Sequence, residues 1–169
     1  ILSIILKSKI KRSSITFKEL YKLTGKNLVV CATNLNKMED EYFNYKNTPN
    51  KDVIEIIRMS MCIPLLYNPI KDDENNNYFV DGALTNNFPI SYFKNKKETL
   101  GMLITSNELS DISNIEDYII RLFSCSFTKL IKNTIQNYSN NTIILKNNFN
   151  FLNFNVPLEQ RQLLIQNGY

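Results

Sequence analysis

The chain has no histidine or tryptophan, and only four of its 169 residues are glycine. Without histidine, neither a Ser-His-Asp triad nor a Cys-His pair can be assembled from this chain. The glycines Gly25, Gly82, Gly101 and Gly168 lie far apart, so no two of them frame a serine in a tight turn. A nucleophile activated by a residue of this chain would therefore need a base other than histidine.

Cysteine is also scarce. Cys31, Cys62 and Cys125 are odd in number, widely spaced and set in apolar surroundings. This pattern argues against a disulfide framework or a metal set, and it predicts buried free thiols in a reducing compartment. The apolar run 1–6 is too short to span a bilayer and its basic residues follow it, so it is neither a signal peptide nor an anchor. We expect a cytoplasmic or otherwise intracellular setting.

The composition is that of one soluble domain of ordinary size, with 43% hydrophobic and 21% charged residues and a net charge of +4. The basic residues form two clusters, Lys7, Lys9, Lys11 and Arg12 near the start and Lys94, Lys96 and Lys97 further on. Basic surface attracts anionic lipid headgroups or nucleic acid, but such a cluster is more often a solvated face. No aromatic-interleaved basic stripe is present, so nucleic-acid binding is not expected.

Helix signals recur along the chain. Thr16 with Glu19 predicts a capping box for a helix that ends at Gly25. A second helix follows Asp52 and must stop before the proline at 64. Ser113 with Glu116 predicts the start of the longest helix, and Pro157 predicts the start of the last one, which ends at Gly168.

Strand signals lie between these helices. Continuous apolar runs predict buried strands over 27–33 and 99–105, with a further strand over 142–146 and an edge-like strand over 41–45. The acidic cluster 71–74 lacks the glycine and the ligand spacing of a calcium loop, and it predicts a solvated turn. Alternating strands and helices predict an α/β layered domain with a mainly parallel or mixed central sheet flanked by helices.

One short apolar run is followed directly by a lone carboxylate at a predicted tight turn. Tyr78 to Val80 predict a short buried strand, which leads directly into Asp81 and Gly82. Glycine lets the backbone turn sharply and lets a partner approach closely. A carboxylate held at the end of a strand suits a general base or an orienting group. The alternative is structural, because Asp-Gly is also a common dipeptide of hairpin turns.

The order of several short motifs carries further information. Thr24-Gly25-Lys26 is followed by 32–35 and 57–64, and then by Asp81-Gly82-Ala83 and Asn86-Asn87-Phe88-Pro89. This ordered set resembles the C-terminal half of patatin-like phospholipases, and the resemblance runs from about Thr16 to the end of the chain. The resemblance implies the patatin-like α/β fold and hydrolysis of phospholipids or other acyl-ester lipids, with possible peripheral membrane contact. We expect no cofactor and no metal.

In that family, a Ser-Asp dyad cleaves the acyl ester, and its aspartate lies in an Asp-Gly-Gly or Asp-Gly-Ala motif. By resemblance the aspartate is Asp81, and Gly82 and Ala83 complete the motif; alanine at the third position is a variation that the family tolerates. Asp81 would take the proton of a serine hydroxyl as its oxygen attacks the ester carbonyl. A Ser-Asp dyad needs no histidine.

The family's nucleophile lies in a Gly-x-Ser-x-Gly turn, and this chain has neither that turn nor a glycine-rich oxyanion loop. Ser60 lies in an apolar stretch and is interpreted as a packing residue. Since the chain also begins with Ile1, we expect residues 1–169 to be the C-terminal part of a single patatin-like domain. Its nucleophile would lie upstream, and the isolated part would be inactive and expose apolar surface.

Two function classes remain open at this point. The first is a lipid acyl hydrolase of the phospholipase A type, with Asp81 as the general base. The second is a non-catalytic, degenerate patatin-like module that binds lipid or a protein partner. A Gly-x-Ser-x-Gly turn encoded upstream of this chain would favour the first class.

Overall fold

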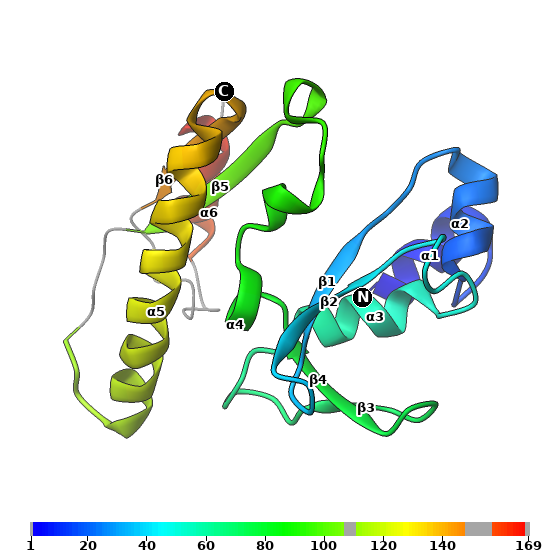
Figure 1. Ribbon diagram of the computed structural model, residues 1–169, viewed down its shortest axis with the longest axis horizontal. Helices are drawn as coiled ribbons and strands as arrows, with labels where there is room; N and C mark the ends of the chain where they lie inside the picture. The colour runs from blue at the N-terminus through cyan, green and yellow to red at the C-terminus, as the bar shows by residue number, and fades with distance from the viewer. Residues whose placement is uncertain (1, 107–110, 148–156, 168–169) are drawn as a thin grey trace.

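The computed structural model describes residues 2–106, 111–147 and 157–167 (Figure 1). The helices are α1 (Leu2–Ile10), α2 (Phe17–Thr24), α3 (Val53–Ser60), α4 (Ala83–Asn86), α5 (Ile115–Tyr138) and α6 (Leu158–Asn167), with short 3-10 helices η1 (Pro89–Tyr92), η2 (Lys96–Glu98) and η3 (Ser139–Asn141). The strands are β1 (Val30–Asn34), β2 (Glu39–Phe43), β3 (Ile70–Asp72), β4 (Asn77–Asp81), β5 (Gly101–Ser106) and β6 (Thr142–Asn147). Within these ranges, no helix is both long and apolar enough to cross a membrane.

Four of the strands form an antiparallel sheet in the order β2-β1-β4-β3. The central strands β1 and β4 pair with Ala32 opposite Asp81 and Asn34 opposite Phe79. Strand β2 lies at one edge, as predicted for the edge-like strand, although it begins at Glu39 rather than at residue 41. The candidate catalytic aspartate therefore ends a central strand, which has a hydrogen-bonded neighbour on each side.

Strands β5 and β6 form a separate parallel pair, connected by α5. The mixed α/β architecture is confirmed, but the described strands do not join into one mainly parallel sheet. The reason is the length of the connections. Short turns join β1 to β2 and β3 to β4, and a short turn can only reverse a strand, whereas a parallel pair needs a long crossover such as α5.

The two faces of the four-stranded sheet pack against different helices. Ala32 points towards α3 and lies in a buried cluster with Ile56 and Met59 of that helix. Successive strand residues point to opposite faces, so Thr33 points the other way, where its hydroxyl meets Thr85 of α4. Helices α1 and α2 extend the α3 side of this core and lie on the opposite side of the view from α5 (Figure 1).

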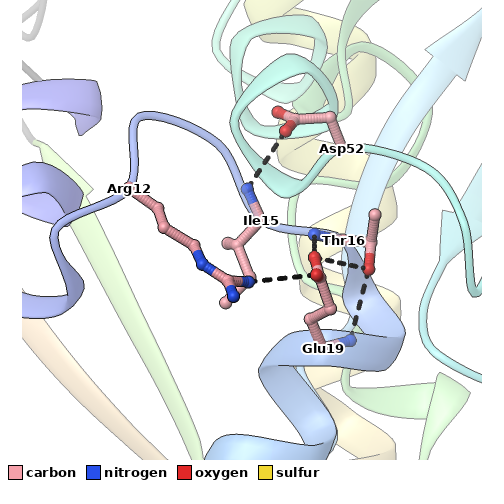
Figure 2. Close-up of polar contacts among 5 residues, drawn as sticks. All are labelled: Arg12, Ile15, Thr16, Glu19 and Asp52. Carbon is pink, nitrogen blue, oxygen red and sulfur yellow. Dashed lines mark hydrogen bonds and ion pairs between the residues drawn. The ribbon is translucent and has the colours of Figure 1, made fainter.

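The capping box predicted at the start of α2 is confirmed. The Thr16 hydroxyl accepts a hydrogen bond from Glu19 N at 3.2 Å, and the Glu19 carboxylate accepts one from Thr16 N at 3.0 Å (Figure 2). Gly25 ends the helix with φ 66°, and its N–H donates to Tyr21 O. Helix α3 follows Asp52 as expected, and Asp52 caps it; the second carboxylate oxygen of Asp52 accepts from Ile15 N at 3.2 Å (Figure 2).

The cap of the longest helix differs from the prediction by one residue. Asn114, not Ser113, accepts the hydrogen bond from Asp117 N, at 2.8 Å. The Asp117 carboxylate in turn accepts from Ser113 N. The sequence offers two overlapping cap patterns here, Ser113 with Glu116 and Asn114 with Asp117, and spacing alone does not distinguish between them.

Burial corrects two further predictions, for the strand over 99–105 and for the cysteines. Strand β5 is buried on one face only, because Leu103 is buried while Met102 and Ile104 are 65% and 55% exposed. Of the cysteines, Cys62 is buried and Cys31 is partly buried, but Cys125 is exposed on α5. Both predictions came from apolar neighbours along the chain, which overestimate burial where only one side of a strand or helix is covered. The apolar surface expected of this chain is present on β5 and elsewhere.

The acidic cluster is not simply a solvated turn. The side chain of Asp72 is only 5% exposed, and Lys51 Nζ lies 2.6 Å from its Oδ1 and 2.9 Å from Glu74 Oε2. Burial lowers the pKa of Lys51, but the hydrogen bonds and charges of Asp72 and Glu74 outweigh it and leave that pKa raised. The contact joins residues 21 positions apart in the chain, so the local sequence contains no sign of it.

The aromatic residues expected to form a connector, Phe149, Phe151 and Phe154, lie outside the described residues, as does Gly168.

Candidate active site

Asp81 is held at the end of β4 by its own backbone. Its N–H donates to Cys62 O, just after α3, at 2.8 Å. Its carbonyl accepts from the Thr33 hydroxyl, on β1, also at 2.8 Å. The position of the carboxylate is thus determined from both sides by parts of the chain that are distant in sequence.

The two carboxylate oxygens of Asp81 differ. Oδ1 accepts a hydrogen bond from Ala83 N at 2.8 Å, which orients the side chain. Among the residues that the structure describes, no donor bonds to Oδ2 and no cation pairs with the carboxylate. Partial burial raises the pKa of Asp81, and the hydrogen bond from Ala83 opposes this only in part. The result is an oriented, more basic carboxylate with one oxygen available to accept a proton.

Position 82 accepts only glycine, because there is no room for a side chain. Its φ of −62° and ψ of −23° are ordinary helical values that any residue adopts. A Cβ at this position, however, would lie 2.4 Å from Cys31 O and 2.8 Å from Cys31 C. The expected close approach of a partner is therefore confirmed, and the partner is the backbone of β1.

The alternative interpretation of Asp81-Gly82 as a hairpin turn is wrong. After Gly82 the chain enters α4, in which Thr85 N and Asn86 N both point back to Gly82 O. Because β4 leads directly into α4, Asp81 lies at the end of a central strand, where side chains of other elements can reach it. The motif is thus a strand-to-helix junction, and Ala83 is the first residue of the helix.

A polar network that the sequence did not reveal fixes α4 against β2. The Asn86 amide donates to Asp40 Oδ2 at 3.2 Å and to the Tyr42 hydroxyl at 2.9 Å. Tyr42 itself donates to Asp40 Oδ2 at 2.6 Å, and its ring stacks on Tyr92. Burial raises the pKa of Asp40, but the hydrogen bonds from Tyr42 and Asn86 outweigh it and leave that pKa lowered. The pKa of Tyr42 is raised, mainly by burial and then by Asp40.

Two thiols adjoin Asp81 without the properties of nucleophiles. Burial raises the pKa of Cys31 to about 11, and the charges of Asp40 and Asp81 add to this. Burial and then the charge of Asp81 also raise the pKa of Cys62, whose thiol donates to Asn68 O. A thiol with a raised pKa stays protonated at neutral pH and is a poor nucleophile.

Among the described residues, no hydroxyl or thiol is hydrogen-bonded to the Asp81 carboxylate. Ser60 is partly buried at the last position of α3, and no described hydrogen bond joins it to the carboxylate. A cavity of about 140 Å³ lies between α4 and α5, lined in part by Asn86, Phe88 and Ile131. Among the described residues, no group of three His, Cys, Asp or Glu side chains could hold a metal ion.

The fold and the site together define the class: an α/β protein with an oriented aspartate in an Asp-Gly-Ala strand-to-helix junction. The family model for patatin-like phospholipases matches residues 3–94, and the chain belongs to this family. The family resemblance expected from the sequence motifs is confirmed.

Two viral proteins are similar in sequence. The chain is 42% identical over 87 residues to the "Probable lipid hydrolase 463L" of Invertebrate iridescent virus 6, covering 50% of this chain and 29% of that protein. It is 26% identical over 177 residues to the "Uncharacterized protein R571" of Acanthamoeba polyphaga mimivirus, covering 97% of this chain and 58% of that protein. The chain thus spans less than two thirds of the length of either relative.

A solved structure supports the fold. The crystal structure of VipD from Legionella pneumophila matches 95% of this chain and 34% of the VipD chain with a TM-score of 0.65. At 19% identity, this match shows a shared fold alone.

Proposed function

We propose that this chain supplies the general base of a lipid acyl hydrolase of the phospholipase A type, and that the base is Asp81. One observation carries the proposal: the Asp81 carboxylate has one oxygen oriented by Ala83 N and a second oxygen that no described residue occupies. Membership of the patatin-like phospholipase family supports a lipid ester as the substrate.

In the proposed mechanism, Oδ2 of Asp81 accepts the hydroxyl proton of a serine as the serine oxygen bonds to the ester carbonyl carbon. The carbonyl electron pair returns and expels the alcohol oxygen, which takes the proton back from Asp81. Water then attacks the acyl-serine with Asp81 again as base, which releases the fatty acid and restores the serine. The raised pKa of Asp81 favours these transfers, because a more basic carboxylate accepts a proton more readily.

The serine and the oxyanion donors are proposed to lie outside these 169 residues, within the same domain. No two glycines of this chain frame a serine, and the chain spans less than two thirds of the relatives it matches. Phospholipids or other acyl glycerides are the proposed substrates, reached by peripheral contact with a membrane. The chain by itself is proposed to be inactive.

Labelling with a fluorophosphonate followed by intact mass tests this proposal. It is run on this chain and on a form extended upstream, each with Asp81→Asn and with the matched control Asp73→Asn, whose carboxylate is exposed. We expect labelling of the extended form only, lost with Asp81→Asn and kept with Asp73→Asn. Labelling that survives Asp81→Asn would overturn the assignment. Absence of labelling in every form would favour a non-catalytic lipid-binding module.

A further inference from the structure

The positive charge of this protein is concentrated in residues 2–26, which form α1, α2 and the segments that follow each helix. Seven cations and a single acid, Glu19, occur in residues 2–26, a net charge of +6, whereas the whole chain carries +4. All seven cations are exposed: Lys7, Lys9, Lys11, Arg12, Lys18, Lys22 and Lys26. The remainder of the chain therefore carries a small net negative charge, and the basic surface is a local feature of α1 and α2.

Aliphatic side chains are exposed among these cations. Ile4 and Ile5 on α1 are 70% and 52% exposed, and Leu23 on α2 is 63% exposed. The opposite side of α1 is held to the protein, because Leu6 and Ile10 pack against the main hydrophobic core. Helix α1 is thus fixed by one side and presents isoleucines and lysines to solvent on the other.

The chain forms an open hollow where α1 ends. Lys11 has a left-handed φ of 57°, and its N–H donates to Lys7 O, which ends the helix and redirects the chain. The hollow measures about 410 Å³ and is lined by Lys7, Lys11, Arg12, Ser13, Ser14 and Glu19. Lysine ammonium groups and serine hydroxyls are donors that suit phosphate oxygens.

The single acid of this surface is already neutralised. Arg12 Nη1 lies 3.1 Å from Glu19 Oε1, while Glu19 Oε2 is engaged by Thr16 (Figure 2). These contacts also lower the pKa of Glu19, the hydrogen bonds from Thr16 most of all. Among the described residues, no carboxylate forms an ion pair with Lys7 or Lys11. Their charges remain available to an anion from outside.

We infer that the exposed surface of α1 and α2 docks on an anionic lipid bilayer, with Lys7 and Lys11 at headgroup phosphates and Ile4 and Ile5 entering the boundary with the acyl chains. Lysines bordering exposed aliphatic side chains are the pattern of an interfacial helix. The inference rests on the proposed function for one point only, that a bilayer is the source of substrate.

Other occupants fit this surface less well. Sites for nucleic acid use arginine and stacking aromatic rings, whereas the one arginine here is paired with Glu19 and the exposed apolar groups are aliphatic. A second copy of the chain would bring two surfaces of net +6 together, and like charges repel. An anionic bilayer satisfies both the cations and the isoleucines.

Vesicle co-sedimentation of the 169-residue chain tests the inference without any need for catalysis, so its failure is distinct from failure of the hydrolase proposal. The vesicles are phosphatidylcholine alone or phosphatidylcholine with about one third phosphatidylserine. The test variant is Lys7→Gln with Lys11→Gln, and the matched control is Lys94→Gln with Lys97→Gln, which removes the same charge from the other basic cluster. Equilibrium unfolding in urea confirms that each variant is folded.

We expect binding to the phosphatidylserine vesicles, weakened about 25-fold by the double change at Lys7 and Lys11 and nearly unchanged by the control. Ile4→Ser with Ile5→Ser should also weaken binding, and high salt should reduce it by screening. Equal binding to neutral vesicles would overturn the inference, as would equal losses in test and control variants. Failure to bind vesicles together with binding to single-stranded RNA would overturn it in favour of a nucleic-acid surface.

Discussion

The Thr33 hydroxyl donates a 2.8 Å hydrogen bond to the backbone carbonyl of Asp81, which lies 48 residues further along the chain. The same hydroxyl lies 2.9 Å from that of Thr85 on α4. One buried side chain of β1 thus contacts both the end of the strand that carries the candidate base and the helix that follows it. Thr33 therefore fixes the backbone of Asp81 relative to β1 and α4.

Replacing Thr33 by valine should therefore destabilise the fold. The isosteric change removes the hydroxyl and leaves the partly buried Asp81 carbonyl without this donor, at a cost of about 1–3 kcal/mol. The free energy of unfolding in urea measures the effect. Thr33→Ser keeps the hydroxyl and serves as the control, with a smaller loss from the missing methyl group. Equal stability of the valine variant and the wild type would show that the hydrogen bond contributes little.

Gly82→Ala should be destabilising for steric reasons. The new methyl group would lie 2.4 Å from Cys31 O, so β1 and the Asp81 junction must separate. Overpacking of this kind costs about 1–3 kcal/mol. The melting temperature provides the measurement. In Gly101→Ala the added Cβ would meet only side-chain atoms, of Phe88 at 2.5 Å and Ile90 at 2.7 Å, and because side chains adjust more readily than a strand backbone, a smaller loss is expected there. A Gly82→Ala protein as stable as the wild type would refute the steric argument.

Asp81→Asn should not destabilise the folded chain at neutral pH, although in the form extended upstream it is expected to remove fluorophosphonate labelling. The pKa of Asp81 is raised in the fold, so this carboxyl favours folding when protonated, and that contribution is lost as pH rises through the folded pKa. Asparagine does not ionise, so the variant escapes this loss of stability and should be at least as stable as the wild type at neutral pH. The difference in stability between variant and wild type should shrink as pH falls towards about 4, the ordinary pKa of aspartate. Urea unfolding over a pH series measures it.

Asp40→Asn is the control, because its effect on stability at neutral pH should be opposite to that of Asp81→Asn. Hydrogen bonds from Tyr42 and Asn86 lower the pKa of Asp40, so its ionised form favours folding above the unfolded-state pKa, and this is lost as pH falls through the folded pKa. The variant should be less stable than the wild type at neutral pH, with a difference that narrows in acid. If both variants shift in the same direction, the two environments do not differ as the structure indicates.

Lys51→Met should cost about 3–5 kcal/mol, because it leaves the buried Asp72 carboxylate without its partner. Lys37→Met is the matched control: Lys37 pairs with Glu41 at 3.5 Å, and the two side chains are 51% and 28% exposed. Exposed pairs contribute about 0–1 kcal/mol. Chemical denaturation of both variants gives the comparison. Similar losses in the two would mean that burial does not strengthen the Lys51 pair.

Local sequence predicted the features that local interactions decide. The capping box of Thr16 and Glu19 and the left-handed Gly25 need only neighbouring residues, so spacing along the chain was sufficient to find them. The strand that ends at Asp81 also follows from its short apolar run. The one-residue error at Asn114 arose where two cap patterns overlap.

Local sequence patterns did not predict the contacts between distant segments. Asn86 meets Asp40, 46 residues away, and Lys51 meets Asp72, 21 residues away. Each residue by itself looks like an ordinary polar surface residue. A weak signal did exist for the first contact, since Asn86 lies in the motif that follows Asp81, but nothing local identifies its partner.

The sequence by itself was sufficient to identify the family resemblance, the absence of histidine from these 169 residues and, through that resemblance, Asp81 as the candidate base, because motif identities and their order along the chain carry this information. Tertiary structure alone decided why Gly82 must be glycine, which oxygen of Asp81 is occupied and which cations remain unpaired. These properties depend on which atoms meet across the sheet and between helices. These contacts depend on side-chain packing and strand register, which the spacing of residues along the chain does not predict.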